Sequence, residues 1–180
     1  MSLLTDAWFW AFVAMFGLQC ATFVVSGHRL GRNLAFTALA LTAVTIGRFL
    51  LVLPFCPQPR FDISIWNWII GGIVLLAAGA IGIPTLSIKW WRAPDPQMRL
   101  RTSWPYSIVR HPMYLSELLW PIGWSIWWGS IYGLALTPIC WIGLLLHVLT
   151  EEKQLEEKLG SQYDDYKKQV PGRIFPRLPI

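Results

Sequence analysis

The segment from Pro112 to Leu149 is almost continuously apolar, and it restricts the possible folds more than any other feature of the sequence. It is too long for one membrane crossing, because a helical span needs about 20 mainly apolar residues. Gly129-Ser130 divides the segment, which predicts two helices joined in a tight hairpin. Three earlier apolar segments complete the pattern, and the five predicted spans cover residues 7–26, 33–53, 66–88, 113–128 and 131–149.

The composition agrees with a membrane protein. Of the 180 residues, 54% are hydrophobic and 14% are charged, whereas an ordinary soluble domain has about 25% charged residues. A net charge of +5 is compatible with a nucleic-acid-binding protein. With so few charged residues and 12 Trp, however, the chain cannot form an extended surface that follows the phosphates of a nucleic acid, so no nucleic-acid partner is expected. We therefore expect one all-α integral membrane domain over residues 1–180: five transmembrane helices, the last two a short helical hairpin, and a cytosolic C-terminal amphipathic helix.

The basic residues predict the orientation, because cytosolic loops are rich in Lys and Arg. All but two of the 15 Lys and Arg fall on one side if the N-terminus is outside and the C-terminus is cytosolic. The exceptions are Arg60, in the second loop, and Arg48, which is expected to snorkel from its span toward the outer surface. The cytosolic set is Arg29, Arg32, Lys89, Arg92, Arg99, Arg101, Arg110, Lys153, Lys158, Lys167, Lys168, Arg173 and Arg177.

The cysteines give no sign of a metal site or a disulfide framework. Cys20, Cys56 and Cys140 are far apart in sequence and have none of the spacings typical of metal ligands. They are expected to be packing residues, and no metal cofactor is predicted.

A first polar motif, Arg110-His111-Pro112-Met113-Tyr114, stands where the fourth span begins. Proline is favoured in the first turn of a helix, where its missing N–H costs nothing. Arg110 and His111 then lie at the positive end of that helix, which suits a carboxylate or phosphate group. The alternative is a basic segment that only sets the topology.

A second polar motif follows the fifth span. His147 and Glu151 are four residues apart and share one helix face, with Glu152 beside them. The helix is expected to continue to Leu159 and to stop at Gly160. His147 lies within the apolar stretch, where ionisable groups are functional candidates, while the two glutamates also fit the start of a solvated helix.

Together these motifs resemble the isoprenylcysteine carboxyl methyltransferase family, a pattern that phospholipid N-methyltransferases share. The resemblance covers residues 98–177 and rests on the Arg-His-Pro motif, the hairpin, the Glu pair and Gly-x-x-Tyr-x-x-Tyr over residues 160–166. It implies that residues 89–180 form the catalytic part. It also implies that S-adenosylmethionine is bound, with S-adenosylhomocysteine as product, by Leu100, Arg101, Tyr106, Arg110, His111, Pro112, Met113, Tyr114, Glu151 and Glu152.

Two positions depart from the family pattern. An arginine that is implicated at the substrate carboxylate is replaced by His147, and a glycine before Tyr106 is replaced by Trp104. His147 is therefore a catalytic candidate either as a base or as a hydrogen-bond donor. Glu117 is a second candidate because it shares a helix face with Tyr114 at i, i+3, although it also fits a packing role between helices.

The predicted function is methyl transfer to a lipophilic acceptor, a small molecule or a lipid, that reaches the cytosolic membrane face through the surrounding lipids. The acceptor most like the family's is a prenylcysteine carboxylate, and a phospholipid amine is the alternative. Sterol reductases, which use NADPH, have a similar Arg-His-Pro-x-Tyr segment, but they carry an Arg-Asp pair where this chain has Glu151-Glu152. A non-catalytic scaffold would leave these residues without a shared purpose.

Overall fold

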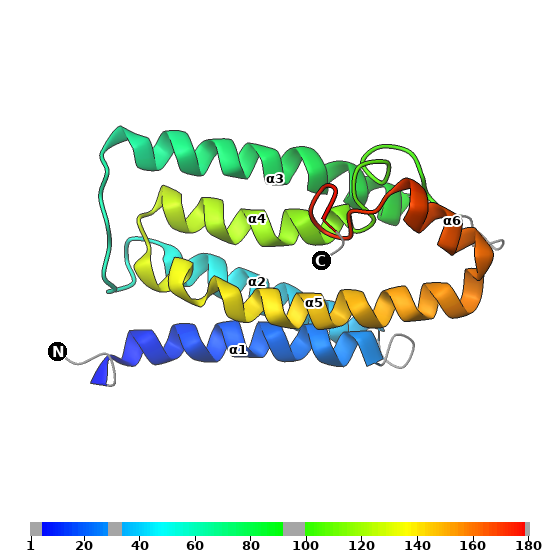
Figure 1. Ribbon diagram of the computed structural model, residues 1–180. Helices are drawn as coiled ribbons and strands as arrows, with labels where there is room; N and C mark the ends of the chain where they lie inside the picture. The colour runs from blue at the N-terminus through cyan, green and yellow to red at the C-terminus, as the bar shows by residue number, and fades with distance from the viewer. Residues whose placement is uncertain (1–4, 29–33, 92–99, 179–180) are drawn as a thin grey trace.

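The computed structural model is a bundle of long helices whose boundaries follow the apolar segments (Figure 1). It describes residues 5–28, 34–91 and 100–178. Over these residues the chain is helical and forms no strand, only one isolated bridge between Arg60 and Ser130. The helices are α1 (Ala7–His28), α2 (Leu34–Val52), α3 (Ile65–Trp91), α4 (Pro112–Trp127), α5 (Ile131–Leu159) and α6 (Ser161–Gln169).

Three of the described helices are long and apolar enough to cross a membrane: α1 over Ala7–Val25, α3 over Ile65–Thr85, and α5. In α2 the apolar stretch is the shorter Thr42–Val52, and α4 has 16 residues. Length and composition thus indicate an integral membrane protein, while the count of five crossings and the orientation of the termini stay predictions. Four basic residues used for the orientation lie outside the described residues: Arg29, Arg32, Arg92 and Arg99.

Glycines let α3 lie directly against α4. A Cβ added to Gly71 would be 2.7 Å from the backbone nitrogen of Trp127, and one added to Gly123 would be 3.1 Å from the Gly71 carbonyl oxygen. Small residues allow this close approach, which is the usual basis of helix association in lipid. The contact fixes α4, and the Arg-His-Pro motif lies at the N-terminal end of this helix.

The turn between α4 and α5 falls at Gly129-Ser130. Gly129 has φ +65°, and Ser130 caps α5 by accepting a hydrogen bond from the Gly133 amide. Arg60 ties this turn to the end of α2, because its guanidinium donates to the carbonyls of Trp128 at 2.7 Å and Leu53 at 2.6 Å. A cation at two helix C-termini is electrostatically favourable.

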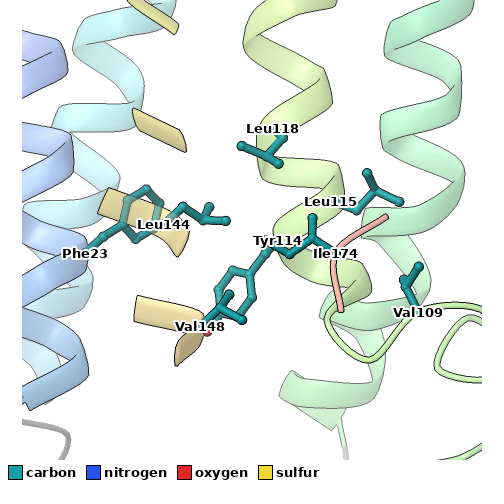
Figure 2. Packing of buried hydrophobic residues seen from close by; sticks show 8 residues of the cluster. All are labelled: Phe23, Val109, Tyr114, Leu115, Leu118, Leu144, Val148 and Ile174. Atoms are coloured by element: carbon teal, nitrogen blue, oxygen red, sulfur yellow. The ribbon is translucent and has the colours of Figure 1, made fainter. Parts of the chain in front are cut away.

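At the other end of the bundle lie the first turn of α4, the polar end of α5, and α6 (Figure 1). The α5 helix ends at Leu159 with Gly160 as its C-cap, as predicted. Beneath this end lies the largest buried apolar cluster (Figure 2), on which Met113 packs. The cluster consists of Phe23, Val109, Tyr114, Leu115, Leu118, Leu144, Val148 and Ile174.

Candidate active site

The site is built where the start of α4 meets the polar end of α5. His111 is the N-cap of α4 and Pro112 its first residue, as the sequence predicts. The imidazole of His111 makes no capping hydrogen bond and faces two carboxylates of α5 instead. Its Nε2 is 3.2 Å from Glu152 Oε1, and its Nδ1 is 3.6 Å from Glu151 Oε2.

Glu152 is a buried carboxylate whose two oxygens both accept hydrogen bonds from other residues of the protein. Its Oε1 accepts from Arg110 Nε and its Oε2 from Arg173 Nε, both at 2.8 Å, and the residue is 4% exposed. It lies beyond the apolar part of α5, which ends at Leu149. Burial alone raises the pKa of Glu152, but hydrogen bonds from His111 and Arg110 outweigh it and lower the pKa to about 2. The carboxylate is therefore ionised at neutral pH.

Arg110 clamps the C-terminal segment to the site. Its Nη1 donates to the carbonyls of Val170 at 3.1 Å and Pro171 at 3.0 Å, and its backbone N–H donates to the Gly172 carbonyl at 2.9 Å. The side chain is buried. These contacts hold the guanidinium of Arg110 on groups of the protein itself, and its contact with the methyl donor stays a prediction.

Glu151 is the more accessible carboxylate of the pair, with its side chain 41% exposed. Its Oε2 accepts from the Tyr114 hydroxyl at 2.8 Å. The buried Tyr114 ring stacks on His111, with the ring centroids 5.6 Å apart. A carboxylate that is held in place by a phenol, yet open on one side, is suited to a charge-assisted hydrogen bond with an ammonium group.

The segment before α4 reaches the same place. The Tyr166 hydroxyl, from α6, donates to the Tyr106 carbonyl at 2.7 Å, and Leu100 packs on the cluster around Tyr166. Burial raises the pKa of the Tyr106 phenol; nearby Arg101 lowers it and Glu151 raises it further. Burial likewise raises the pKa of Tyr166 to about 12. Arg101 and Glu151 thus both lie within electrostatic reach of Tyr106.

His147 lies one turn before Glu151, inside the bundle and 7% exposed. Its Nδ1 is 2.9 Å from the carbonyl oxygen of Phe23 in α1. The ring meets Tyr114 edge-on, with centroids 5.4 Å apart and an interplanar angle of 75°. His147 and Glu151 therefore share Tyr114 as a neighbour.

Glu117 lies apart from this group, in an ion pair with Arg48 of α2. The Arg48 Nη2 to Glu117 Oε1 distance is 3.1 Å, and the Trp120 indole donates to Glu117 Oε2 at 3.0 Å. Arg48 is 2% exposed and also donates to Cys140 Sγ. The expectation that Arg48 snorkels to the surface is wrong, because a carboxylate, a thiol and an aromatic face meet its charge inside the bundle.

The structure thus places all but one of the predicted site residues at one end of the bundle. No group of three or more His, Cys, Asp or Glu that could hold a metal ion occurs among the residues it describes. The gathered residues are Leu100, Arg101, Tyr106, Arg110, His111, Pro112, Met113, Tyr114, His147, Glu151 and Glu152.

A family model described as phospholipid methyltransferase matches residues 67–162, which is more than half of the chain and includes both polar motifs. The chain belongs to the phospholipid methyltransferase family. The family resemblance noted in the sequence is thereby confirmed.

Curated relatives of this family member include three kinds of enzyme. A protein-S-isoprenylcysteine O-methyltransferase of Schizosaccharomyces pombe is 32% identical over 75 residues, covering 41% of the chain and 31% of the relative. A methanethiol S-methyltransferase of Pseudomonas sp. is 29% identical over 118 residues, covering 61% and 44%. A delta(14)-sterol reductase of Mus musculus is 34% identical over 73 residues, covering 39% and 18%. The chain thus spans less than half the length of each, and no solved structure gives a significant match.

Two residues that contact the site in this phospholipid methyltransferase family member were not among the predicted site residues. Arg173 pairs with Glu152, and its position between two prolines close to the Tyr-rich helix was a signal that it returns to the site. The Phe23 carbonyl, which holds His147, has no signal in sequence, because every residue carries the same backbone oxygen.

Proposed function

We propose that this protein transfers the methyl group of S-adenosylmethionine to a lipophilic acceptor at the membrane surface. The observation that carries the proposal is the accessible carboxylate of Glu151, held by Tyr114 and flanked by His111. S-adenosylmethionine supplies an electrophilic methyl group on a sulfonium, together with an ammonium and a carboxylate. The polar groups of the site match these charges.

Each part of that match uses residues already described. Glu151 accepts from the ammonium group, and Arg101, close to Tyr106, is the candidate partner of the carboxylate. The rings of Tyr106 and Tyr114 suit the adenine or the sulfonium, an attraction worth about 0.5–2 kcal/mol. The remaining contribution of the protein is alignment and exclusion of water.

Glu152, Arg110 and Arg173 act differently from Glu151 in this proposal. Their contacts are with one another and with the C-terminal backbone. We assign them the role of holding His111 and the start of α4 in place. Glu151 and Glu152 are thus neighbours with separate tasks, one binding the methyl donor and the other fixing the site.

Three chemistries are open for the acceptor. The resemblance favours a prenylcysteine carboxylate, the family model points to a phospholipid amine, and the methanethiol relative points to a thiol. A reductase that uses NADPH is the second function, favoured by the similarity of 73 residues to the mouse sterol reductase. The binding of the nucleotide separates the transferase from the reductase.

The deciding experiment is calorimetry on the detergent-purified chain with S-adenosylhomocysteine. We expect binding, and we expect Glu151→Ala to weaken it at least tenfold, which corresponds to ~1.4 kcal/mol. Glu157→Ala is the matched control, because Glu157 is an exposed carboxylate on the same helix. If the unsubstituted protein binds NADPH but not S-adenosylhomocysteine, the proposed methyltransferase function is wrong and the reductase function is supported.

A second measurement identifies the bond that is made. The protein is incubated with a radiolabelled methyl donor and a total membrane lipid extract, and the labelled products are separated. Label released by mild base indicates a methyl ester, whereas stable label indicates an N-methyl or S-methyl product.

A further inference from the structure

A groove follows one face of α5 at the place where the apolar part of this helix ends. Its volume is about 470 Å³, which is within the usual range of ligand pockets. Val24 of α1 forms one wall, since α1 and α5 lie side by side along the bundle (Figure 1). The other lining residues follow one another at the spacing of a single stripe on a helix. They are Leu146, Leu149, Thr150, Lys153, Gln154 and Glu157.

The groove is apolar at one end and charged at the other. Leu146 and Leu149 are 47% and 42% exposed, and the apolar stretch of the sequence ends at Leu149. Lys153 follows four residues later and Glu157 another four, each a step of about 6 Å along the helix axis. Within the part of the chain that the structure describes, neither charge takes part in an ion pair. In a membrane the groove would therefore pass from the hydrocarbon into the headgroup region.

We infer that this groove binds one zwitterionic glycerophospholipid of the bilayer. The groups along the groove have the same order as the groups along such a lipid. An acyl chain lies on Val24, Leu146 and Leu149. The phosphate then meets Lys153, a residue that commonly binds phosphate. The ammonium, which is the outermost group of the lipid, meets the carboxylate of Glu157.

This lipid is a bound ligand rather than the methyl acceptor. Of the residues that the structure gathers at the proposed methyl-donor site, none lines the groove. Glu151 and Glu157 belong to the same helix but serve different ligands. The inference therefore goes beyond the proposed function and does not depend on it.

Other occupants would leave part of the groove unmatched. A free phosphate ion would pair with Lys153 but would leave the exposed leucines uncovered. A lipid with a net negative charge would bring no cation to Glu157, whose carboxylate would repel it. The apolar face of a second copy of the chain would cover the leucines but would bury both charges without partners, which is costly. A lipid that carries both charges offers a partner to each part of the groove.

The test is native mass spectrometry of the full chain released from detergent micelles. Phosphatidylcholine, phosphatidylglycerol and diacylglycerol with identical acyl chains are added in turn. We expect one phosphatidylcholine to bind, more tightly than either of the other two lipids. Phosphatidylcholine is the probe because its quaternary ammonium accepts no further methyl group, so its binding is not that of a methyl acceptor.

Variants of the two charges identify the groups that hold the lipid. Lys153→Gln should weaken phosphatidylcholine binding about fivefold, which corresponds to ~1 kcal/mol. Glu157→Gln should weaken phosphatidylcholine binding but strengthen phosphatidylglycerol binding, because it removes the repulsion of the anionic lipid. Lys153→Glu combined with Glu157→Lys keeps the net charge and reverses the order of the charges, so it should abolish the preference for phosphatidylcholine. Lys158→Gln is the control, because Lys158 is exposed on the same helix but does not line the groove.

The other possible outcomes overturn the inference. Equal binding of the three lipids, or binding that none of the groove variants changes, would show only the contact that any membrane protein makes with lipid. A preference for phosphatidylglycerol would assign the groove to an anionic lipid, and a dimer without bound lipid would assign it to a second copy of the chain. Circular dichroism checks that each variant is folded. We expect Lys153→Gln to bind S-adenosylhomocysteine as the unsubstituted protein does, so a failure of the proposed function is observed separately from a failure of this inference.

Discussion

Replacing Glu152 by glutamine tests the arrangement of charges that holds the site together. Glu152 is buried and accepts from Arg110 and Arg173, and His111 lies 3.2 Å from the same carboxylate. The amide keeps the shape of the side chain but removes its charge, which leaves the buried guanidinium of Arg110 unpaired. Breaking a buried ion pair from one side costs about 3–5 kcal/mol, so we expect Glu152→Gln to lower the free energy of unfolding by that amount.

The assay is reversible unfolding of the full chain in mixed micelles, followed by circular dichroism. Glu156→Gln is the matched control, because Glu156 is on the same helix, 46% exposed, and paired with Lys167. An exposed ion pair contributes about 0–1 kcal/mol. If the two variants lose the same stability, Glu152 does not carry the role that its contacts indicate.

The same substitution has a pH signature. The pKa of Glu152 in the folded protein is lowered to about 2. Its contribution to stability is therefore present above the pKa of an unfolded carboxyl, about 4.3, and is lost as the pH falls toward 2. The difference in stability between the unsubstituted protein and Glu152→Gln should shrink between about pH 4.5 and pH 2, and a difference that stays constant over this range would refute the argument.

Two further comparisons test packing and the intramembrane ion pair, both by unfolding in micelles. Gly143→Ala should lower the free energy of unfolding by about 1–3 kcal/mol, because the added Cβ would lie 2.7 Å from Cys20 Cα. Gly17→Ala is the control: a Cβ there meets open space, so the substitution should be neutral or stabilising by up to about 1 kcal/mol. Equal effects of the two substitutions would contradict the close approach of α1 and α5. Arg48→Met should destabilise by about 3–5 kcal/mol, and the double variant with Glu117→Gln should be destabilised by less than the sum of the two single changes. Strict additivity would show that the two side chains do not interact.

Local features of the site were predictable from sequence because their causes are local. Proline at position 112 favours the first turn of a helix, and Gly160 favours its end, so the boundaries of α4 and α5 at the site follow from neighbouring residues. The spacing of His147 and Glu151 likewise predicts a shared face. These predictions required only the helix period and the preferences of single residues.

The pairing of distant side chains was not predictable. Arg48 and Glu117 are 69 positions apart, and nothing in either segment shows that one faces the other. Adjacent residues of a helix point about 100° apart, so Glu151 and Glu152 necessarily face different surroundings, but the sequence does not show which of them turns inward. The pairing of Arg110 with Glu152 likewise depends on how α4 packs against α5, which the sequence does not show.

The site is completed by the C-terminal segment, which is the last of its parts to be synthesised. The backbone N–H groups of Arg110 and His111 donate to the carbonyls of Gly172 and Arg173, each at 2.9 Å. The motif at the start of α4 is therefore completed by residues that leave the ribosome some sixty positions later. All five long helices are made before these partners exist, so we expect the proposed methyl-donor site of a newly inserted bundle to stay incomplete until Gly172 and Arg173 have folded back.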